Sequence, residues 1–441
     1  MSNNLALKKG LDIPIKGSAA PEVIKTVSPD VVAVKPTDFK GLVPRLLVKE
    51  GDAVKAGSPV MADKQRPEIL FTSPVSGTVQ QVVRGEKRKL LAVLVKADAK
   101  QEFVDFGAKA PASAAETCTL LLKSGLWGAL VQRPYGVMAN PDVMPKAIFI
   151  SSFSTAPLAA DTDFALGDAL TDLQSGVDAL SKIAPVHLSV KKAGSPFAGI
   201  KNVTLHNVSG PHPAGNVGVQ ISHIDPIRKG EVAWTLSLLH VAALGHLVNS
   251  GKLVLTRKVA VTGPAAPKTG YVTALPGTPV SALTEVGKDV RVIGGDALSG
   301  ETLGAEGYLG FFDNQITLLR EGFDREWFGW AKPFRPKVYS SSWSYFSWLT
   351  PGKKYDMDTN LHGGPRAFVE TKCFEDVTPM DIFPIYLIKA CLAGDIEKME
   401  KFGIYEVLPE DLALCDYVDP SKNEIQAIIQ KGIDLMIKEM A

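Results

Sequence analysis

Cysteine is scarce in this chain, which has 4 cysteines among 441 residues. Cys118, Cys373, Cys391 and Cys415 are too few and too scattered to form a disulfide scaffold, and this usage is typical of a reducing compartment. An iron–sulfur centre needs several closely spaced thiolates, whereas these cysteines lie far apart. We therefore expect neither disulfides nor an iron–sulfur cluster held by this chain.

Long apolar runs are also missing. The most apolar segment, residues 232–248, contains His240 and His246, and it is shorter than the about 20 apolar residues that a membrane-spanning helix needs. The N-terminus has no apolar core or cleavage pattern of a secretory signal. These features predict a cytoplasmic protein with a buried helix at 232–248, so any membrane association has to come through a partner.

Neither sign of charge predominates, because 48 Lys and Arg stand against 47 Asp and Glu. Without a basic patch, nucleic acid is not an expected partner. The histidines are spaced too widely for a compact metal motif, and nothing in the sequence brings a Ser–His–Asp set together. The sequence thus predicts no metal ligands and no catalytic residues.

Glycine-rich phosphate loops are absent as well. Residues 124–136 carry glycines, but not at the Gly-x-Gly-x-x-Gly spacing, and no Walker-type motif occurs. Backbone amides approach a pyrophosphate only where side chains are missing, and Trp127, Leu130 and Arg133 fill that space. Neither a flavin nor a nicotinamide site is predicted.

The sequence does contain a run of short predicted strands and tight turns between residues 42 and 83. Residues 42–48 and 78–83 are β-prone, and Gly, Pro, Asp and Ser clusters lie between them. The pattern resembles the barrel-sandwich hybrid of lipoyl and biotinyl carrier domains. Lys64 is the only candidate for a modified carrier lysine, although its flanking residues match the carrier motif poorly. A carrier or binding module of a soluble enzyme, using Lys64, is therefore the alternative function.

The full length predicts a multidomain α+β protein. We expect a barrel-sandwich hybrid fed by the N-terminal residues, a central α/β domain with a long helix at 162–183, a small β-grasp domain, an aromatic irregular connector, and a helical domain. Thr378 and the Ser421–Glu424 capping box are the expected helix starts in the last of these. The expected boundaries are 1–100, 103–255, 256–330, 331–374 and 375–441.

Several longer motifs together resemble one known family. They are Ser124-Gly-Leu-Trp127, His212-Pro-Ala-Gly-Asn-Val-Gly218, His223-Ile-Asp-Pro226, Arg257-Lys-Val-Ala-Val-Thr-Gly-Pro264, Tyr308-Leu-Gly-Phe-Phe-Asp-Asn-Gln315 and Asp411-Leu-Ala-Leu-Cys-Asp-Tyr-Val418. Over essentially the whole chain, this set looks like the A subunit of the sodium-translocating NADH:quinone oxidoreductase (Na+-NQR). That family is related to the C subunit of the Rnf complex and to the flavin-carrying subunit of complex I.

The resemblance implies a peripheral subunit on the cytoplasmic face of the bacterial inner membrane. Its complex oxidises NADH, reduces quinone and exports sodium ions, using flavins and iron–sulfur centres. A flavin-bearing integral membrane subunit is the expected partner. This chain itself is expected to bind no redox cofactor, to contribute to assembly, and to be inactive in isolation.

Two sets of aromatic residues are candidate sites. In the segment that holds flavin in relatives, Trp127 and Tyr135 offer rings, and Gln132 and Arg133 offer donors, for a quinone head. The ring of Phe39, in a separate turn, suggests a second wall. The alternative is that Trp127 and Leu130 only fill a vacated site.

Farther along the chain, the aromatic stretch 325–348 includes Trp343 and Trp348. These two tryptophans are candidates for docking to a membrane subunit. The alternative is a local core beneath a long loop.

Overall fold

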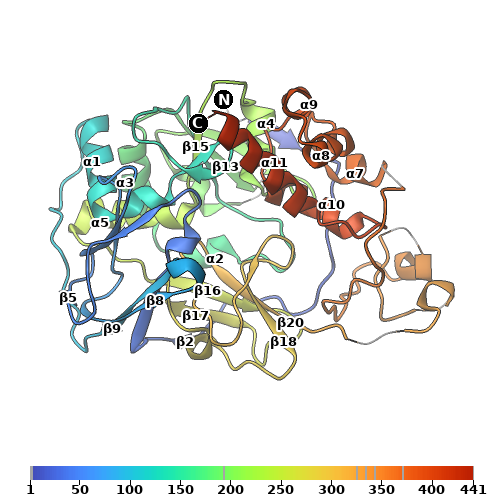
Figure 1. The fold of residues 1–441 in the computed structure, drawn as a ribbon, viewed down its shortest axis with the longest axis horizontal. Helices are drawn as coiled ribbons and strands as arrows, with labels where there is room; N and C mark the ends of the chain where they lie inside the picture. The colour runs from blue at the N-terminus through green and yellow to red at the C-terminus, as the bar shows by residue number, and fades with distance from the viewer. Residues whose placement is uncertain are drawn as a thin grey trace.

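The computed structural model describes residues 3–191, 194–323, 326–332, 335–341, 344–369 and 372–440. Four β-sheets and their covering helices are arranged around a common centre (Figure 1). The C-terminal helices lie beside the parallel sheet, and the β-barrel lies on the opposite side of the molecule (Figure 1). These features confirm the predicted α+β class with a barrel-sandwich start, a central α/β part and a helical end.

A seven-stranded, mostly parallel sheet forms the middle of the molecule. Its five parallel strands are neighbours in space, and an antiparallel hairpin extends one edge. In spatial order the strands are β1 (Asn3–Ala6), β14 (Thr204–Ser209), β13 (Val186–Lys191), β12 (Ile148–Ser151), β15 (Ala233–Thr235), β10 (Val131–Arg133) and β11 (Val137–Met138).

Helices cover both faces of this sheet, because its central strands alternate between two apolar clusters. Ile148 and Ile150 of β12 face the main core, whereas Phe149 faces a second cluster. The first face packs on α1 (Ala114–Ser124), α3 (Leu170–Leu180) and α5 (Leu238–Ser250), and the second on α4 (Val217–Ile224). Gly176 and Gly245 let α3 and α5 approach closely, since a Cβ at either position would overlap a backbone carbonyl.

Two expected helices begin or end differently. The helix expected at 162–183 is interrupted at Gly167–Ala169, so that α2 (Thr162–Leu166), capped by Asp161, is separate from α3. The helix expected at 232–248 begins only at Leu238, because residues 233–235 form a strand and Ser237 is the N-cap. In both places the apolar residues continue across the break, so the sequence pattern predicted one continuous helix.

The barrel-sandwich part consists of two small antiparallel sheets whose inner faces share one core. Val32, Val93, Met61 and Phe71 are buried between them. One sheet holds β3 (Val31–Val34), β9 (Leu90–Ala97), β8 (Gly77–Arg84) and β5 (Ala53–Val54), and the other holds β4 (Pro44–Leu46), β6 (Pro59–Asp63) and β7 (Leu70–Thr72).

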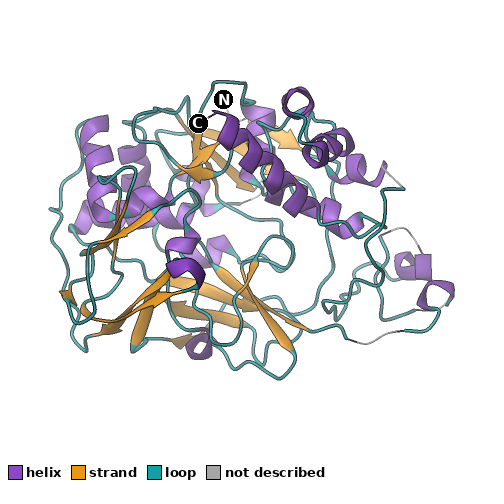
Figure 2. Cartoon of the chain, viewed as in Figure 1, coloured by secondary structure: helices purple, strands orange, loops and turns teal. Residues whose placement is uncertain are grey.

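The part expected to be a β-grasp unit, called the β-grasp part below, contains a six-stranded mixed sheet and one short helix; its strands lie at the bottom of Figure 2. In spatial order they are β19 (Glu301–Thr302), β18 (Val290–Gly294), β20 (Gln315–Arg320), β16 (Arg257–Thr262), β17 (Gly270–Ala274) and β2 (Val23–Thr26). Helix α6 (Val280–Leu283) packs its Val280 and Leu283 side chains on this sheet.

The N-terminal residues do not feed the barrel in the way we expected. Strand β1 pairs in parallel with β14 at the edge of the central sheet, and β2 pairs in parallel with β17. Between them, Ile13 and Ile15 are buried in the C-terminal helical cluster. Before it enters the barrel, the first part of the chain therefore contacts the central sheet, the C-terminal helical cluster and the six-stranded sheet.

The C-terminal region is helical, as expected, and it packs around one apolar cluster. Its helices are α7 (Lys372–Val377), α8 (Pro384–Ala393), α9 (Ile396–Phe402), α10 (Ala413–Val418) and α11 (Ile425–Met440). Short 3-10 helices occur at Pro36–Asp38, Glu86–Arg88, Leu126–Ala129, Pro196–Gly199, Gly329–Ala331, Ser344–Leu349 and Pro409–Leu412.

Both helix starts that we expected in this region are wrong. Helix α8 begins at Pro384 rather than beside Thr378, which is buried within the cluster. Helix α11 begins at Ile425, and the Asp416 carboxylate accepts its first backbone N–H groups, from Ile425 and Gln426. A residue from the preceding helix therefore replaces the expected Ser421–Glu424 box.

Within the described ranges, no helix is both long and apolar enough to cross a bilayer. The segment that had seemed most apolar is divided between β15 and α5.

The cap of α11 gives a first prediction. Asp416→Ala should lower the free energy of unfolding by about 1–2 kcal/mol, because two N–H groups of the first turn lose their acceptor. Urea denaturation of the full chain measures the change. Glu424→Ala is the matched control and should cost much less, since the amides of this turn bond to Asp416 instead. Equal losses in the two variants would contradict this assignment.

Candidate functional site

The central sheet has one topological switch point, between β12 and β15. From β12 the chain moves outward to β13 and β14, and then it returns to β15 on the other side of β12. Open α/β sheets bind ligands outside the carboxyl ends of the strands at such a point. Ser151 ends β12 and Thr235 ends β15, so these two residues mark the position of the candidate site.

Two neighbouring cavities open at this position. One, of about 420 Å³, is lined by residues of the barrel part, the central sheet and the β-grasp part, among them Phe39, Thr235 and Phe312. The other, of about 450 Å³, lies between α2, the start of α5 and β16. Ser151, Ser237 and Phe312 line both. Leu408 and Glu410 of the helical region also line the first cavity, so the site is a cleft shared by four parts of the molecule.

An aromatic cluster forms one wall of the cleft. The ring of Phe39 lies 4.5 Å from that of Phe71 and 4.9 Å from that of Phe311, between ring centroids. Phe312 contacts the same group at 5.9 Å and stays 37% exposed. His240 stacks on Phe311 with a centroid distance of 4.7 Å. The Phe rings are tilted by 50–83° to one another, so the wall offers apolar ring faces and edges, with one open ring.

Of the five residues predicted for a quinone site, Phe39 alone lines the cavity of about 420 Å³. Trp127 is 0% exposed; its Nε1 donates to the Ala139 carbonyl at 2.8 Å, and its ring packs 5.3 Å from that of Trp234. Gln132 accepts a bond from the Asn140 amide at 3.1 Å. The structure therefore places Trp127 in the core beneath the cleft and Gln132 in the hairpin beside it.

Arg133 and Tyr135 connect the hairpin to the helical region. Arg133, 2% exposed, donates to the Asp411 carboxylate at 2.8 Å and to Glu410 at 2.9 Å. Burial disfavours the guanidinium charge, but the two carboxylates outweigh it and raise the pKa of Arg133. The Tyr135 ring lies 6.2 Å from that of Tyr405. These two side chains therefore bind another part of the protein.

The cleft also contains residues that the sequence reasoning missed. Phe312, His240 and Arg257 all line it. They come from the loop before β20, from α5 and from β16, so no spacing in the sequence links them. The motifs that contain Phe312 and Arg257 were recognised only as family signatures.

The predicted interface residues are only partly visible. Trp343 lies outside the described residues. Trp348 is 49% exposed, and its ring centroid lies 6.5 Å from that of Phe346.

The four cysteines are free thiols. Burial raises the pKa of Cys391 and of Cys415 to about 12, so both remain protonated near neutral pH. In the part of the chain that the structure describes, no group of three or more His, Cys, Asp or Glu side chains could hold a metal ion. A cluster ligand must be a thiolate, and two of these groups are poorly suited to that role.

Lys64 lies in the exposed turn that follows β6, where its backbone N–H donates to the Val43 carbonyl at 2.7 Å. The preceding residue, Asp63, is 0% exposed. Nothing in this geometry favours a carrier lysine over an ordinary solvated one.

The Arg133 contact gives a second prediction. Arg133→Met should lower the free energy of unfolding by about 3–5 kcal/mol, because Asp411 would remain buried as an uncompensated charge. The double variant Arg133→Met with Asp411→Leu should recover most of that loss, as measured by urea denaturation.

Arg291→Met serves as the control, because it removes a more exposed ion pair with Glu321, and it should cost about 1 kcal/mol or less. If Arg133→Met costs no more than this control, the buried contact contributes little to stability.

Comparison with known proteins identifies the family. Residues 5–98 match the family model described as the NqrA N-terminal barrel-sandwich hybrid domain, and residues 112–253 match the NqrA second alpha/beta domain. These matches agree with the barrel part and the central sheet.

Relatives match over the full length. The chain is 36% identical to the A subunit of the Na(+)-translocating NADH-quinone reductase of Neisseria meningitidis serogroup A, over 99% of this chain and 100% of the relative. It is 36% identical to the protein of that name from Actinobacillus pleuropneumoniae serotype 5b, with the same coverage.

A solved NAD+-reducing NiFe-hydrogenase in its H2-reduced state is only remotely similar, at 11% identity and a TM-score of 0.33 over 67% of this chain and 55% of that chain. The two family models and the full-length relatives lead to one conclusion, which confirms the resemblance seen in the sequence: the chain belongs to the NqrA family, the A subunits of the Na(+)-translocating NADH-quinone reductase.

Proposed function

We propose that this chain is a peripheral subunit of a bacterial complex that oxidises NADH, reduces quinone and exports sodium ions. It would lie on the cytoplasmic face of the inner membrane, attached to an integral membrane subunit that carries flavin. The names of the relatives, which match this chain from end to end, support the reaction. The kinship of this family with the Rnf and complex I subunits remains a prediction.

The chain would contribute no redox cofactor of its own, so that flavins and iron–sulfur centres of other subunits carry the electrons. Two observations support this part of the proposal. Trp127 and Leu130 are fully buried in the segment where a flavin loop would keep space clear. Cys391 and Cys415 are buried, neutral thiols.

Quinone would bind in the cavity of about 420 Å³ at the switch point, and this cavity is the observation that carries the proposal. A quinone head needs a flat apolar wall and a hydrogen-bond donor for a carbonyl oxygen. Phe312 would supply one ring face, with Phe39 at 65° to it. Lys40 lines the same cavity; its ammonium donates to Gln430 Oε1 at 3.3 Å and has further N–H groups that can donate to a quinone. In this arrangement Trp127 and Arg133 support the cavity from behind, and Gln132 and Tyr135 flank it.

The open ring of the wall provides the test of quinone binding. Phe312→Ala should weaken binding of a quinone analogue to the assembled complex several-fold, because the analogue loses its exposed aromatic contact. Phe323→Ala, which removes a ring that is 73% exposed and lies away from this cavity, is the control and should leave affinity unchanged. An unchanged affinity for Phe312→Ala in an intact complex would leave the cavity without a role in quinone binding.

Attachment to the membrane provides a separate test. Replacing Trp343 and Trp348 together with alanine should reduce recovery of flavin-bearing membrane subunits when the chain is pulled down from solubilised membranes, because interface aromatics bury large areas. The isolated variant should keep the melting temperature of the parent chain. A variant that unfolds by itself would show that these rings belong to a local core.

A further inference from the structure

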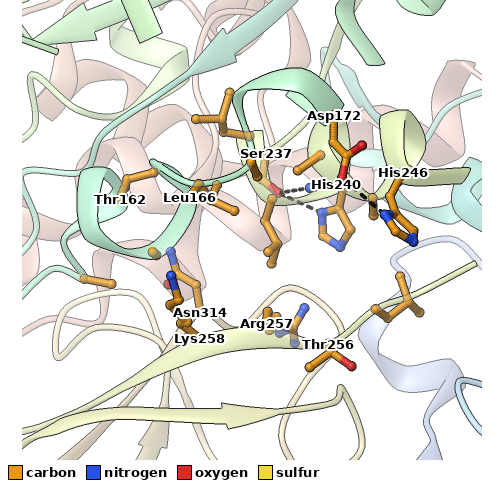
Figure 3. A pocket seen from close by; sticks show the side chains of 18 of the residues that line it. Thr162, Leu166, Asp172, Ser237, His240, His246, Thr256, Arg257, Lys258 and Asn314 are labelled. Carbon is orange, nitrogen blue, oxygen red and sulfur yellow. Dashed lines mark hydrogen bonds and ion pairs between the residues drawn. The ribbon is translucent and has the colours of Figure 1, made fainter. Parts of the chain in front are cut away.

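The second cavity of the cleft, of about 450 Å³, has features that quinone binding does not explain. Its lining includes small apolar residues, among them Ala165 and Ala242, and two carboxylates, Asp168 and Asp172, which already bond to Lys258 and His246. Cavities of this size accommodate organic ligands. Figure 3 shows Ser237 and His240 on one side of the space and Arg257 and Lys258 on the other.

Arg257 is a buried cation that forms no ion pair with a carboxylate in the described part of the chain. It is 6% exposed, and its two terminal nitrogens donate to the backbone carbonyls of Phe311 and Gly310 at 2.7 and 2.6 Å. Among the described residues no acidic oxygen lies within 4.0 Å of the guanidinium, and its Nε has no hydrogen-bond partner. Burial lowers the pKa of Arg257 to about 10. The side chain is therefore still charged near neutral pH.

The nearest carboxylates are already bound elsewhere. Asp38 pairs with Lys35 at 2.9 Å and accepts the Phe311 amide at 2.7 Å. Asp313 accepts the Gly310 amide at 2.8 Å. Both attract Arg257 from a distance, but neither forms an ion pair with it. A buried charge is costly unless it is paired, so the guanidinium favours an anion in the cavity beside it.

The opposite wall adds a second polar group and the N-terminus of a helix. Helix α5 is 13 residues long and begins at this cavity, with Ser237 as its N-cap. Such a terminus favours negative charge. His240, 2% exposed, bonds through Nδ1 to the Ser237 hydroxyl at 2.7 Å, and its Nε2 has no hydrogen-bond partner among the residues that the structure describes. In Figure 3 the imidazole points toward Arg257.

His240 is neutral in this environment. Burial first, and then the charge of Arg257, lower its pKa to about 3, against a smaller opposing effect of the Phe311 backbone. When the Ser237 hydroxyl donates to Nδ1, the neutral ring keeps its proton on Nε2. The imidazole then offers a donor on the side of the cavity that faces the guanidinium.

We propose that this cavity binds an organic anion, a carboxylate or phosphate monoester with an apolar body. Its negative group would lie between Arg257 and His240, near the start of α5. Its body would pack on the small apolar residues around Ala165 and Ala242. An inorganic anion would leave those apolar walls uncovered, so it should bind less tightly. The proposal does not rest on quinone binding in the neighbouring cavity.

Isothermal titration of the full chain tests it with four probes. Phenyl phosphate and benzoate represent the two anion classes, phenol is the neutral match, and inorganic phosphate lacks the apolar body. We expect one of the two aromatic anions to bind at least tenfold more tightly than phenol and inorganic phosphate. The better of the two identifies the anion class. If neither aromatic anion binds more tightly than phenol, the proposal is wrong.

Variants locate the binding. Arg257→Met should lower the affinity for the better probe at least tenfold, because the cation is lost. Arg291→Met, whose arginine pairs with Glu321 in the same sheet at 2.8 Å, is the matched control and should bind like the parent. Equal affinity of Arg257→Met and the parent chain would overturn the proposal.

Removal of Arg257 also deprives two backbone carbonyls of their donor, so a second variant tests the cavity while keeping the arginine. Ala169→Phe adds a ring to the lining of the cavity and should lower the affinity of the better probe at least tenfold. Unchanged binding in this variant would place the probe elsewhere on the protein and refute the assignment.

Discussion

One buried ion pair joins the central sheet to the C-terminal helical region. Arg133 leaves the β10–β11 hairpin of the central sheet and meets Asp411 of the 3-10 helix Pro409–Leu412, both almost fully buried. The contact passes over Gly218 at the start of α4, where any Cβ would collide with both partners. The segments of Arg133, Gly218 and Asp411 are far apart in the sequence, and all three must be in position for this ion pair to form. Because an unpaired buried charge is costly, this contact favours the observed position of the helical region, together with the apolar cluster that includes Ile13 and Val219.

The position of the helical region determines part of the shape of the cleft. Leu408 and Glu410, next to Asp411, line the cavity that Phe39 and Phe312 also line. The barrel part contributes Phe39 through a short 3-10 helix, Pro36–Asp38, and the β-grasp part contributes Phe312 from the loop before β20. The cleft is therefore a property of the arrangement of four parts, and no single part contains it.

The sequence allowed the barrel turns to be predicted because glycine, proline and aspartate act within a few residues. Prediction failed where a distant residue competes with a local one. The Ser421–Glu424 pattern looked like a cap, but Asp416 reaches the same amide groups from the preceding helix. Similarly, nothing in the sequence distinguishes Arg257 from an exposed arginine, and only the fold shows that it is buried in a cavity opposite His240. Phe39 was predicted only because its side chain is aromatic, whereas Phe312 lies in a family motif but was not predicted as a site residue.

The N-terminal strands impose an order on folding. Strand β1 pairs with residues 206–209, and β2 pairs with residues 271–273, so both strands are synthesised long before their partners. Contacts of such long sequence separation are slow to form. During synthesis, β1 leaves the ribosome about 200 residues before β14, at roughly 5–20 residues per second. For that interval β1 cannot form the hydrogen bonds that it makes with β14 in the folded protein, so the central sheet can be completed only after the chain has emerged as far as Thr235, the end of β15.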